Sequence, residues 1–462
     1  MRRLGLLAAV FAMPLLCTSS TGVKLPAYTR QVLPNGVVVD LMPKPGVPLV
    51  GIRIVVRGGA EADSPDLAGL GAITAQLLRK GTEKRNADQF SAELDSLGGS
   101  FNVFTDGYAP ATNITSEFLT KDFDAGLDLV SDAVLHPIFP DAEVRKLIAQ
   151  RTDAIHAAKD NPQQSIGYYY QAFFFGPSHP YGHPADESTL GRIRREDIVH
   201  QHKRLYCGRN MIVVVSGDFD SAQIQAKIAR AFGDAPAGEV FERTSNAQIA
   251  AGPRLLLVDK PDATQTYFQI GQPGIDRRNP DRTKLLVLNT LFGGRFTSML
   301  NEALRVESGL TYGAFSTVQQ FRLPASILIS TYTKTETTGK AIDMALDVLN
   351  KFGENGITAD QLASSKAYIK GTFPTQRLET SDELATIVSE LELYGLGTDE
   401  IDGLFSRIDA LTLEEANAAA RKYYRTDRLT FVVIGNASKI RDAVQKYATN
   451  ITELKVSSPG FR

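Results

Sequence analysis

The sequence predicts an α+β protein of two homologous domains, each a mostly antiparallel sheet packed with helices. The first observation is internal similarity: both halves run from paired strands through helical segments to a final apolar strand. The second is the segment that closes each half, HKRLYCGRNMIVVVSGDFD in the first and ARKYYRTDRLTFVVIGNAS in the second. Two unrelated α+β domains remain the alternative interpretation.

Local signals place the elements of the first half. Asn35-Gly36 lies between two β-rich runs and predicts a hairpin that opens the sheet. A helix is expected over 67–79, and a later helix should end at Gly98-Gly99, where alternating strand residues begin. The continuous apolar run 211–215 predicts a buried strand. One further helix has an apolar face formed by Phe123, Leu127, Val130 and Val134.

The second half repeats this order. Two strands are expected in RLLLVDKPDATQTYFQIGQPG, a helical segment in LLVLNTLFGGRFTSMLNEALR and an amphipathic helix in TGKAIDMALDVLNKFGENG. We therefore expect an N-terminal domain over 24–237, a linker over 238–252, a C-terminal domain over 253–447 and a tail over 448–462.

Composition narrows the class of protein. The chain has 462 residues, 43% of them hydrophobic and 22% charged, which is typical of a folded globular protein of more than one domain. Its formal net charge of -2 offers no electrostatic attraction for nucleic acid or an anionic membrane. Neither partner is expected.

The N-terminus has the layout of a secretory signal. Arg2 and Arg3 precede an apolar run over 4–16, which is too short to span a membrane and is followed by small and hydroxyl residues. We expect residues 1–22 to be a signal peptide and the mature protein to be periplasmic. Cys17 is a possible lipidation site, although Leu16 is larger than the small residue usual before such a cysteine.

Several stretches resemble the pitrilysin and insulinase family of zinc peptidases, which includes the mitochondrial processing peptidase and its bacterial relatives. They are GLGAITAQLLRKGT, GPSHPYGHP, the two strand closings, and LFGGRFTSMLNEALRVESGLTYGAFS. The resemblance covers nearly the whole mature chain. It implies two processing-peptidase-like domains that form half of a clamshell.

The resemblance also implies that the zinc ligands and the general base are absent from this chain. Active members carry HxxEH, in which two His bind zinc and the Glu is the general base. Aligned on the flanking residues, the His positions here are Ala72 and Gln76, and the base position is Ala75. The third ligand position falls at or near Leu147, one turn after Glu143. We expect no catalytic residue and no metal ligand on this chain, because zinc needs about three donors of His, Cys or carboxylate type.

Other residues offer no replacement site. The prolines and glycine of HPYGHP exclude a regular helix that would align His179 and His183, so a structural loop is expected there. The alternative is a metal site, for which the two His would need further carboxylate or thiol ligands. His200 and His202 are interpreted as ordinary polar positions. Cys207 comes just before a buried strand and is expected to be a core or half-buried thiol.

Two residues lie in a segment that resembles a substrate-binding segment of the family. The segment LRVESGLTYGAFS resembles the family segment whose Arg and Tyr hold the substrate backbone opposite the zinc, here Arg305 and Tyr312. The resemblance implies a substrate-positioning subunit that works with a homologous zinc-bearing subunit on peptide substrates. One alternative is a structural or assembly protein of the same fold. The other is an independent peptidase with a relocated metal site, so whether the chain is itself an enzyme stays open.

Overall fold

The computed structural model describes residues 22–105, 110–242, 245, 248–250 and 252–462. The expected signal segment and Cys17 lie outside these residues. In the described part of the chain, no helix is both long and apolar enough to cross a membrane.

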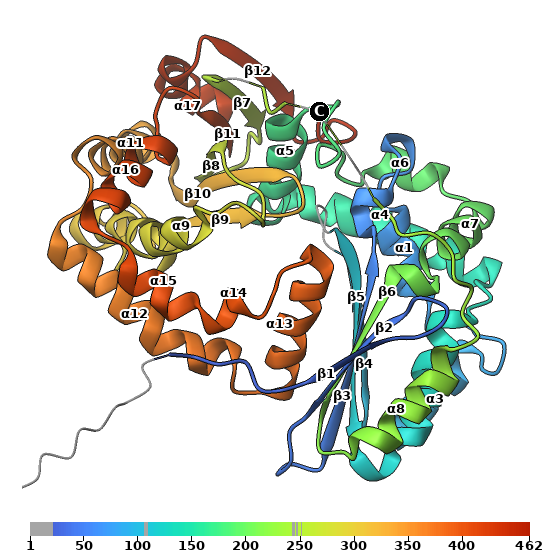
Figure 1. The fold of residues 1–462 in the computed structure, drawn as a ribbon. Helices are drawn as coiled ribbons and strands as arrows, with labels where there is room; N and C mark the ends of the chain where they lie inside the picture. The colour runs from blue at the N-terminus through green and yellow to red at the C-terminus, as the bar shows by residue number, and fades with distance from the viewer. Residues whose placement is uncertain (1–21, 106–109, 243–244, 246–247, 251) are drawn as a thin grey trace, which may run out of the picture.

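The first domain contains a six-stranded sheet in the order β1-β2-β6-β3-β5-β4 (Figure 1). Only β2 and β6 run parallel, and the other neighbours are antiparallel. The predicted hairpin is confirmed, because Val32 pairs with Val38 around Asn35-Gly36. The predicted buried strand is also confirmed, since every residue of β6 is buried. The strands are β1 (Thr29–Val32), β2 (Val38–Pro43), β3 (Leu49–Arg57), β4 (Ser100–Phe104), β5 (Ala111–Leu119) and β6 (Met211–Gly217).

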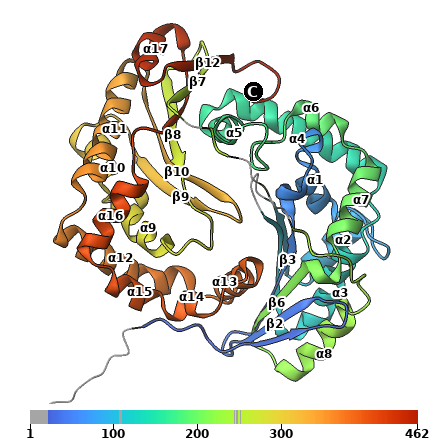
Figure 2. The same cartoon turned by 45° about the horizontal axis from the view of Figure 1, so that its top comes forward.

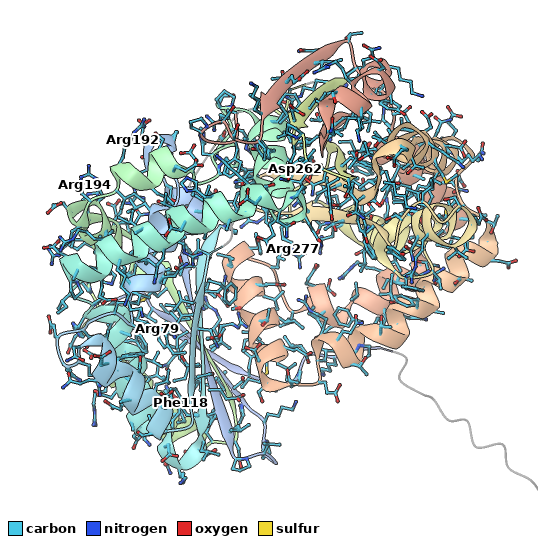
Figure 3. The ribbon with its side chains drawn as sticks, turned by 180° about the vertical axis from the view of Figure 1, so that it is seen from behind. Arg79, Phe118, Arg192, Arg194, Asp262 and Arg277 are labelled. Atoms are coloured by element: carbon cyan, nitrogen blue, oxygen red, sulfur yellow. The ribbon has the colours of Figure 1, made fainter. Side chains whose placement is uncertain are left out.

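Helices cover the outer face of this sheet. The four apolar positions predicted for α3 are all buried, and Gly126 on the same helix lies so close to Phe118 of β5 that an added Cβ would approach the ring at 2.5 Å. Phe118 lies in the layer between sheet and helices (Figure 3). The helices are α1 (Leu70–Leu77), α2 (Ala87–Ser96), α3 (Phe123–Leu135), α4 (Asp141–Asp160), α5 (Pro162–Phe175), α6 (Glu187–Arg192), α7 (Arg195–Leu205) and α8 (Ser221–Phe232).

The second domain repeats the sheet. Its order is β12-β7-β11-β8-β10-β9, and the five strands from β7 to β9 follow the order and directions of β2-β6-β3-β5-β4. The predicted repeat and the α+β class are therefore confirmed. The strands are β7 (Arg254–Asp259), β8 (Gln265–Pro273), β9 (Ala314–Gln320), β10 (Pro324–Lys334), β11 (Thr430–Gly435) and β12 (Asn450–Lys455).

The second domain is richer in short helices. The helical segment expected over LLVLNTLFGGRFTSMLNEALR is interrupted: π-helical turns occupy Thr290–Gly294 and Glu302–Glu307, and Ser298 caps a new start between them. Two adjacent glycines weaken the helix at this break. The helices are α9 (Arg282–Asn289), α10 (Met299–Asn301), α11 (Thr338–Asn355), α12 (Ala359–Arg377), α13 (Ser381–Tyr394), α14 (Asp399–Asp402), α15 (Leu404–Ala410), α16 (Leu413–Tyr423) and α17 (Ala437–Val444).

The two domains exchange helices. α13 packs on β3 and β6 of the first sheet, and α5 packs on β8 and β11 of the second. Gly271 of β8 permits the second contact, because a Cβ there would lie 1.9 Å from the Tyr170 hydroxyl of α5. Arg53 of β3 also pairs with Asp382 of α13 at 2.9 Å. The domains curve toward each other, and α13 stands on their inner side (Figure 2).

Residues 448–462 are not the expected tail. Asn450–Lys455 forms β12, an edge strand of the second sheet that pairs with β7. The chain then returns to the first domain, where Phe461 is buried against Tyr168 and Tyr169. The side chains of β12 are mostly exposed, so this strand lacks the apolar pattern that would have marked it in the sequence. We call residues 456–462 the strap.

Candidate functional site

Helix α1 keeps the frame of a metal-binding helix for reasons of packing. Leu70, Ile73 and Leu77, together with Leu78 just beyond its end, are buried in the core of the first domain. The helix is therefore maintained by its apolar face, whatever its other face carries.

The other face carries the three substituted positions. Ala75 is buried, whereas Ala72 and Gln76 are half-buried and line a pocket of about 350 Å³. Gln76 Oε1 accepts a hydrogen bond of 2.8 Å from Nε of Arg151, which belongs to α4. An arginine therefore lies beside the positions where an active relative would hold zinc.

The third ligand position expected at or near Leu147 does not face the substituted residues of α1. Leu147 packs against the apolar core and does not line the pocket, and neither does Glu143. Arg151, four residues after Leu147 on the same helix, lies opposite Gln76 instead. Spacing along the chain does not determine which residue of α4 faces α1, because that depends on how the two helices pack.

These residues do not fit a zinc ion. Alanine has no donor atom, a neutral amide is a poor ligand for zinc, and the Arg151 guanidinium would repel a divalent cation. Among the residues that the structure describes, no group of three His, Cys, Asp or Glu side chains could hold a metal.

We expect the purified chain to retain no stoichiometric zinc after incubation with zinc chloride and gel filtration, as measured by elemental analysis. The double variant Ala72→His/Gln76→His is the positive control, since it places two imidazoles one turn apart on α1 and should retain more metal. One zinc per unmodified chain would contradict the assignment of these positions as vacant.

Two of the histidines, His179 and His202, have structural roles. His179 is buried in a loop, as expected, where Nδ1 accepts a 3.1 Å hydrogen bond from the Tyr181 N–H. His202 is not the ordinary polar residue expected from the sequence, because Phe139 and Tyr206 enclose its ring and Nε2 bonds the Val134 carbonyl at 2.9 Å. Burial lowers the His202 pKa to about 4, so the ring is neutral at pH 7.

Cys207 matches its prediction. The thiol is buried and free, and burial raises its pKa. A buried, protonated thiol is a poor nucleophile, so Cys207 is a packing residue.

Arg305 and Tyr312 lie on a surface of the second domain. Tyr312 is 81% exposed, which rules out a core aromatic role. Arg305 lies in the π-helical turn Glu302–Glu307, with its guanidinium 4.5 Å from the centre of the Phe296 ring. We call the following five residues of the segment 296–315 the Arg305 surface: Phe296, Arg305, Val306, Tyr312 and Phe315.

The Arg305 surface is unusually apolar for exposed residues. Phe296 is 61% exposed, Val306 59% and Phe315 49%. Aromatic residues and arginine are the residue types enriched in the energetic centres of interfaces. Neither Arg305 nor Tyr312 lines the pocket beside Ala72 and Gln76. The chain thus carries two separate features, a vacated pocket on the first domain and a donor-bearing surface on the second.

Sequence comparison agrees with this geometry. A family model described as "Insulinase (Peptidase family M16)" matches residues 38–174, and one described as "Peptidase M16 inactive domain" matches residues 192–369. The chain belongs to peptidase family M16. With Ala72, Ala75 and Gln76 at the zinc and base positions, it is a non-catalytic M16 member.

Relatives of this chain include one protein named as a zinc protease and one named as a non-peptidase homolog. An uncharacterized zinc protease of Mycobacterium bovis is 27% identical over 402 residues, which cover 86% of this chain and 90% of the relative. A protein named "Non-peptidase homolog YmxG" from Helicobacter pylori is 25% identical over 401 residues, which cover 85% of this chain and 90% of the relative.

Solved structures share the fold. A crystal structure of a peptidase M16 inactive domain from Pseudomonas fluorescens matches with a TM-score of 0.82 at 21% identity, over 88% of this chain and 98% of that one. A protease structure from Helicobacter pylori matches with a TM-score of 0.80 at 19% identity, over 89% of this chain and 100% of that one. These likenesses confirm the two-domain M16 architecture.

Two residues of these features, Arg151 and Phe296, were not predicted from the sequence. Arg151 was not singled out because it is distant in sequence from Gln76, and only helix packing brings the two together. Phe296 could have been noticed as an aromatic residue just after Gly293-Gly294, in the segment that carries the family resemblance.

Proposed function

We propose that this chain is the non-catalytic, substrate-positioning subunit of an exported, heteromeric zinc peptidase that acts on peptides or unfolded segments. One observation carries the proposal: donors suited to a peptide backbone are presented at the surface, while the zinc positions on the same chain lack ligands. The zinc belongs to a homologous partner subunit in this scheme.

The chemistry of the Arg305 surface suits this role. A guanidinium stacked on an aromatic ring keeps its N–H groups free at its edge, because the ring contacts only its face. Arg305 can therefore donate to a peptide carbonyl while Phe296 supports it. The Tyr312 hydroxyl adds one directed donor, and the exposed apolar side chains of the same segment exclude water when a partner covers them.

The location is part of the proposal. Arg2 and Arg3, followed by a short apolar run, support export to the periplasm, with the mature chain beginning between Cys17 and Lys24. Contact with a membrane would then depend on lipidation at Cys17.

The test is isolation of the tagged chain from its own cells. We expect a homologous chain with an intact HxxEH motif and bound zinc to copurify in equal amount, and we expect only the pair to cleave peptides. Recovery of this chain alone, or activity of the zinc-bearing chain that does not change when this chain is removed, would contradict the proposal. The alternative, a structural protein of the same fold, predicts a stable complex whose activity does not depend on Arg305 and Tyr312.

A further inference from the structure

The pocket beside the vacated zinc positions is a built cavity of about 350 Å³. We call it the vacated pocket. It lies between α1, α4 and the end of β4, and the loop before α6 closes its far side. Its volume is close to the lower limit of small-ligand sites, which range from about 300 to 1,000 Å³. It therefore suits one side chain or a small molecule better than a long peptide.

Its charge comes from Arg151. Nε of Arg151 donates to Gln76, while the two terminal nitrogens form no hydrogen bond or ion pair with any residue that the structure describes. The acidic residue of the lining, Asp63, uses its carboxylate to accept hydrogen bonds from the Gly69 and Gly71 N–H groups and from Gln201. The guanidinium thus has a neutral hydrogen-bond partner, and its two terminal nitrogens remain available as donors to a ligand at the pocket.

The rest of the lining is largely apolar. Ala72, Ile73, Ala154 and Ile155 form the walls between the two helices. Phe104 and Tyr168, also in the lining, are 44% and 37% exposed. A ligand that enters can bury carbon surface on these side chains, at about 25 cal/mol for each Å² removed from water.

The strap holds one side of the pocket in place. Phe461 stacks on Tyr168 with ring centres 4.9 Å apart, and Arg462 donates to Nδ1 of His183 at 2.8 Å. Both Tyr168 and His183 line the vacated pocket. The strap is itself fixed, because Lys159 Nζ donates to the Ser458 carbonyl at 2.8 Å and the Gly460 N–H donates to Glu187 at 3.0 Å. The pocket is therefore formed before any ligand arrives, which lowers the cost of binding.

We infer that the vacated pocket binds a carboxylate carried on an apolar body. The carboxylate pairs with the two terminal nitrogens of Arg151, which match its two oxygens, and the apolar body lies against the walls from α1 and α4. The ligand is either the C-terminal residue of a peptide or a free organic acid, since both present this chemistry. The inference concerns the first domain and stands apart from the proposed role of the Arg305 surface.

Other ligand classes fit less well. Arg151 repels ammonium groups and metal ions. A phosphate dianion needs more donors than one guanidinium supplies, and the walls around Arg151 offer mainly carbon. A neutral apolar ligand would leave the two terminal nitrogens of Arg151 without an acceptor.

Calorimetric titration of the mature chain tests the inference. The probes are hexanoate, hexylammonium, and a five-residue peptide ending in leucine with either a free carboxylate or an amide at its C-terminus. We expect binding of hexanoate or of the free-acid peptide, with the ammonium and the amide at least about tenfold weaker, because each lacks the charge-assisted pair with Arg151. Binding of the peptide alone identifies a chain end as the ligand, and binding of both identifies any apolar carboxylate.

Variants assign the binding to the pocket. Arg151→Met keeps the length of the side chain and should weaken the bound carboxylate at least about tenfold. Arg145→Met is the matched control, because Arg145 is exposed on the same helix and lies outside the pocket lining. The inference is overturned if neither carboxylate binds at millimolar concentration, if hexylammonium binds equally well, or if the two variants behave alike. None of these outcomes bears on copurification of a partner, so the two proposals fail separately.

Discussion

Asp40→Asn should stabilise the protein at pH 8 by about 2–4 kcal/mol, the largest gain that we expect from any single substitution in this chain. Asp40 lies on β2, on the side of the first sheet that packs against α13. It is fully buried, and neither of its carboxylate oxygens has a hydrogen-bond partner among the described residues. Burying a carboxylate without partners is costly, and the asparagine removes the charge at nearly constant volume.

The pH dependence follows from the same burial. Burial raises the Asp40 pKa to about 7, the charge of Glu392 on α13 adds to the shift, and Arg30 on β1 opposes it. Tyr28 is the other titratable group that interacts with this carboxyl. The unfolded chain loses this proton near pH 4, whereas the folded protein keeps it until about pH 7. The folded state therefore binds more protons across this window, and its stability falls as the pH rises from about 4 to 7.

Urea unfolding at pH 4.5 and pH 8 checks this prediction. The parent and Asp40→Asn should differ little at pH 4.5, where the folded carboxyl is protonated, and most at pH 8. Asp95→Asn is the control, because Asp95 is exposed on α2 and forms no side-chain hydrogen bond among the described residues. Equal unfolding midpoints for parent and Asp40→Asn at pH 8 would show that the buried carboxylate is compensated.

Local patterns in the sequence were enough to predict much of the fold. The apolar run that became β6, the Asn35-Gly36 hairpin and the apolar face of α3 are each encoded within a few residues. The repeat was visible because both halves close with similar strands, and the matching strand orders confirm it. Ala72, Ala75 and Gln76 could be identified because all three lie on one short helix inside a contiguous motif.

Features that depend on distant contacts could not be predicted. The apolar residues of α5 and of α13 predict that each helix is buried against another surface. They do not predict that this surface is the sheet of the other domain. The strap and the isolation of Asp40 under α13 arise only when the two halves meet. The pairing of Gln76 with Arg151 arises only when α4 packs against α1 within the first domain. Arg305 and Tyr312 were singled out by resemblance, but their exposure and the Phe296 stack required the structure.

Arg305→Ala and Tyr312→Phe should each lower peptide turnover by the reconstituted pair about ten- to a thousandfold, if these donors act mainly on the transition state. Neither substitution removes much core, because Tyr312 is 81% exposed and Arg305 packs mainly on Phe296, itself exposed. Folding and association with the zinc-bearing partner should therefore stay nearly intact. Arg305→Lys should restore little, because an ammonium lacks the planar fork of donors. If the two residues bind the ground and transition states equally, the Michaelis constant should rise instead of the turnover number falling.

The deciding measurement compares peptide cleavage by each variant, and by the double variant, at matched concentration of the assembled pair. Arg428→Ala is the control, because Arg428 is an exposed arginine of the same domain outside the Arg305 surface. Its kinetics should match the parent, which would show that loss of a surface charge on this domain is not enough to impair turnover.

A turnover number that falls with unchanged assembly would establish that this chain contributes donors to a site whose metal lies on another chain. Parental kinetics in both single variants and in the double variant would remove the functional case for Arg305 and Tyr312. Exposed aromatic residues without a catalytic effect would then identify this face as an assembly surface, and the structural role would be the better account of why an M16 chain keeps its fold without its zinc ligands.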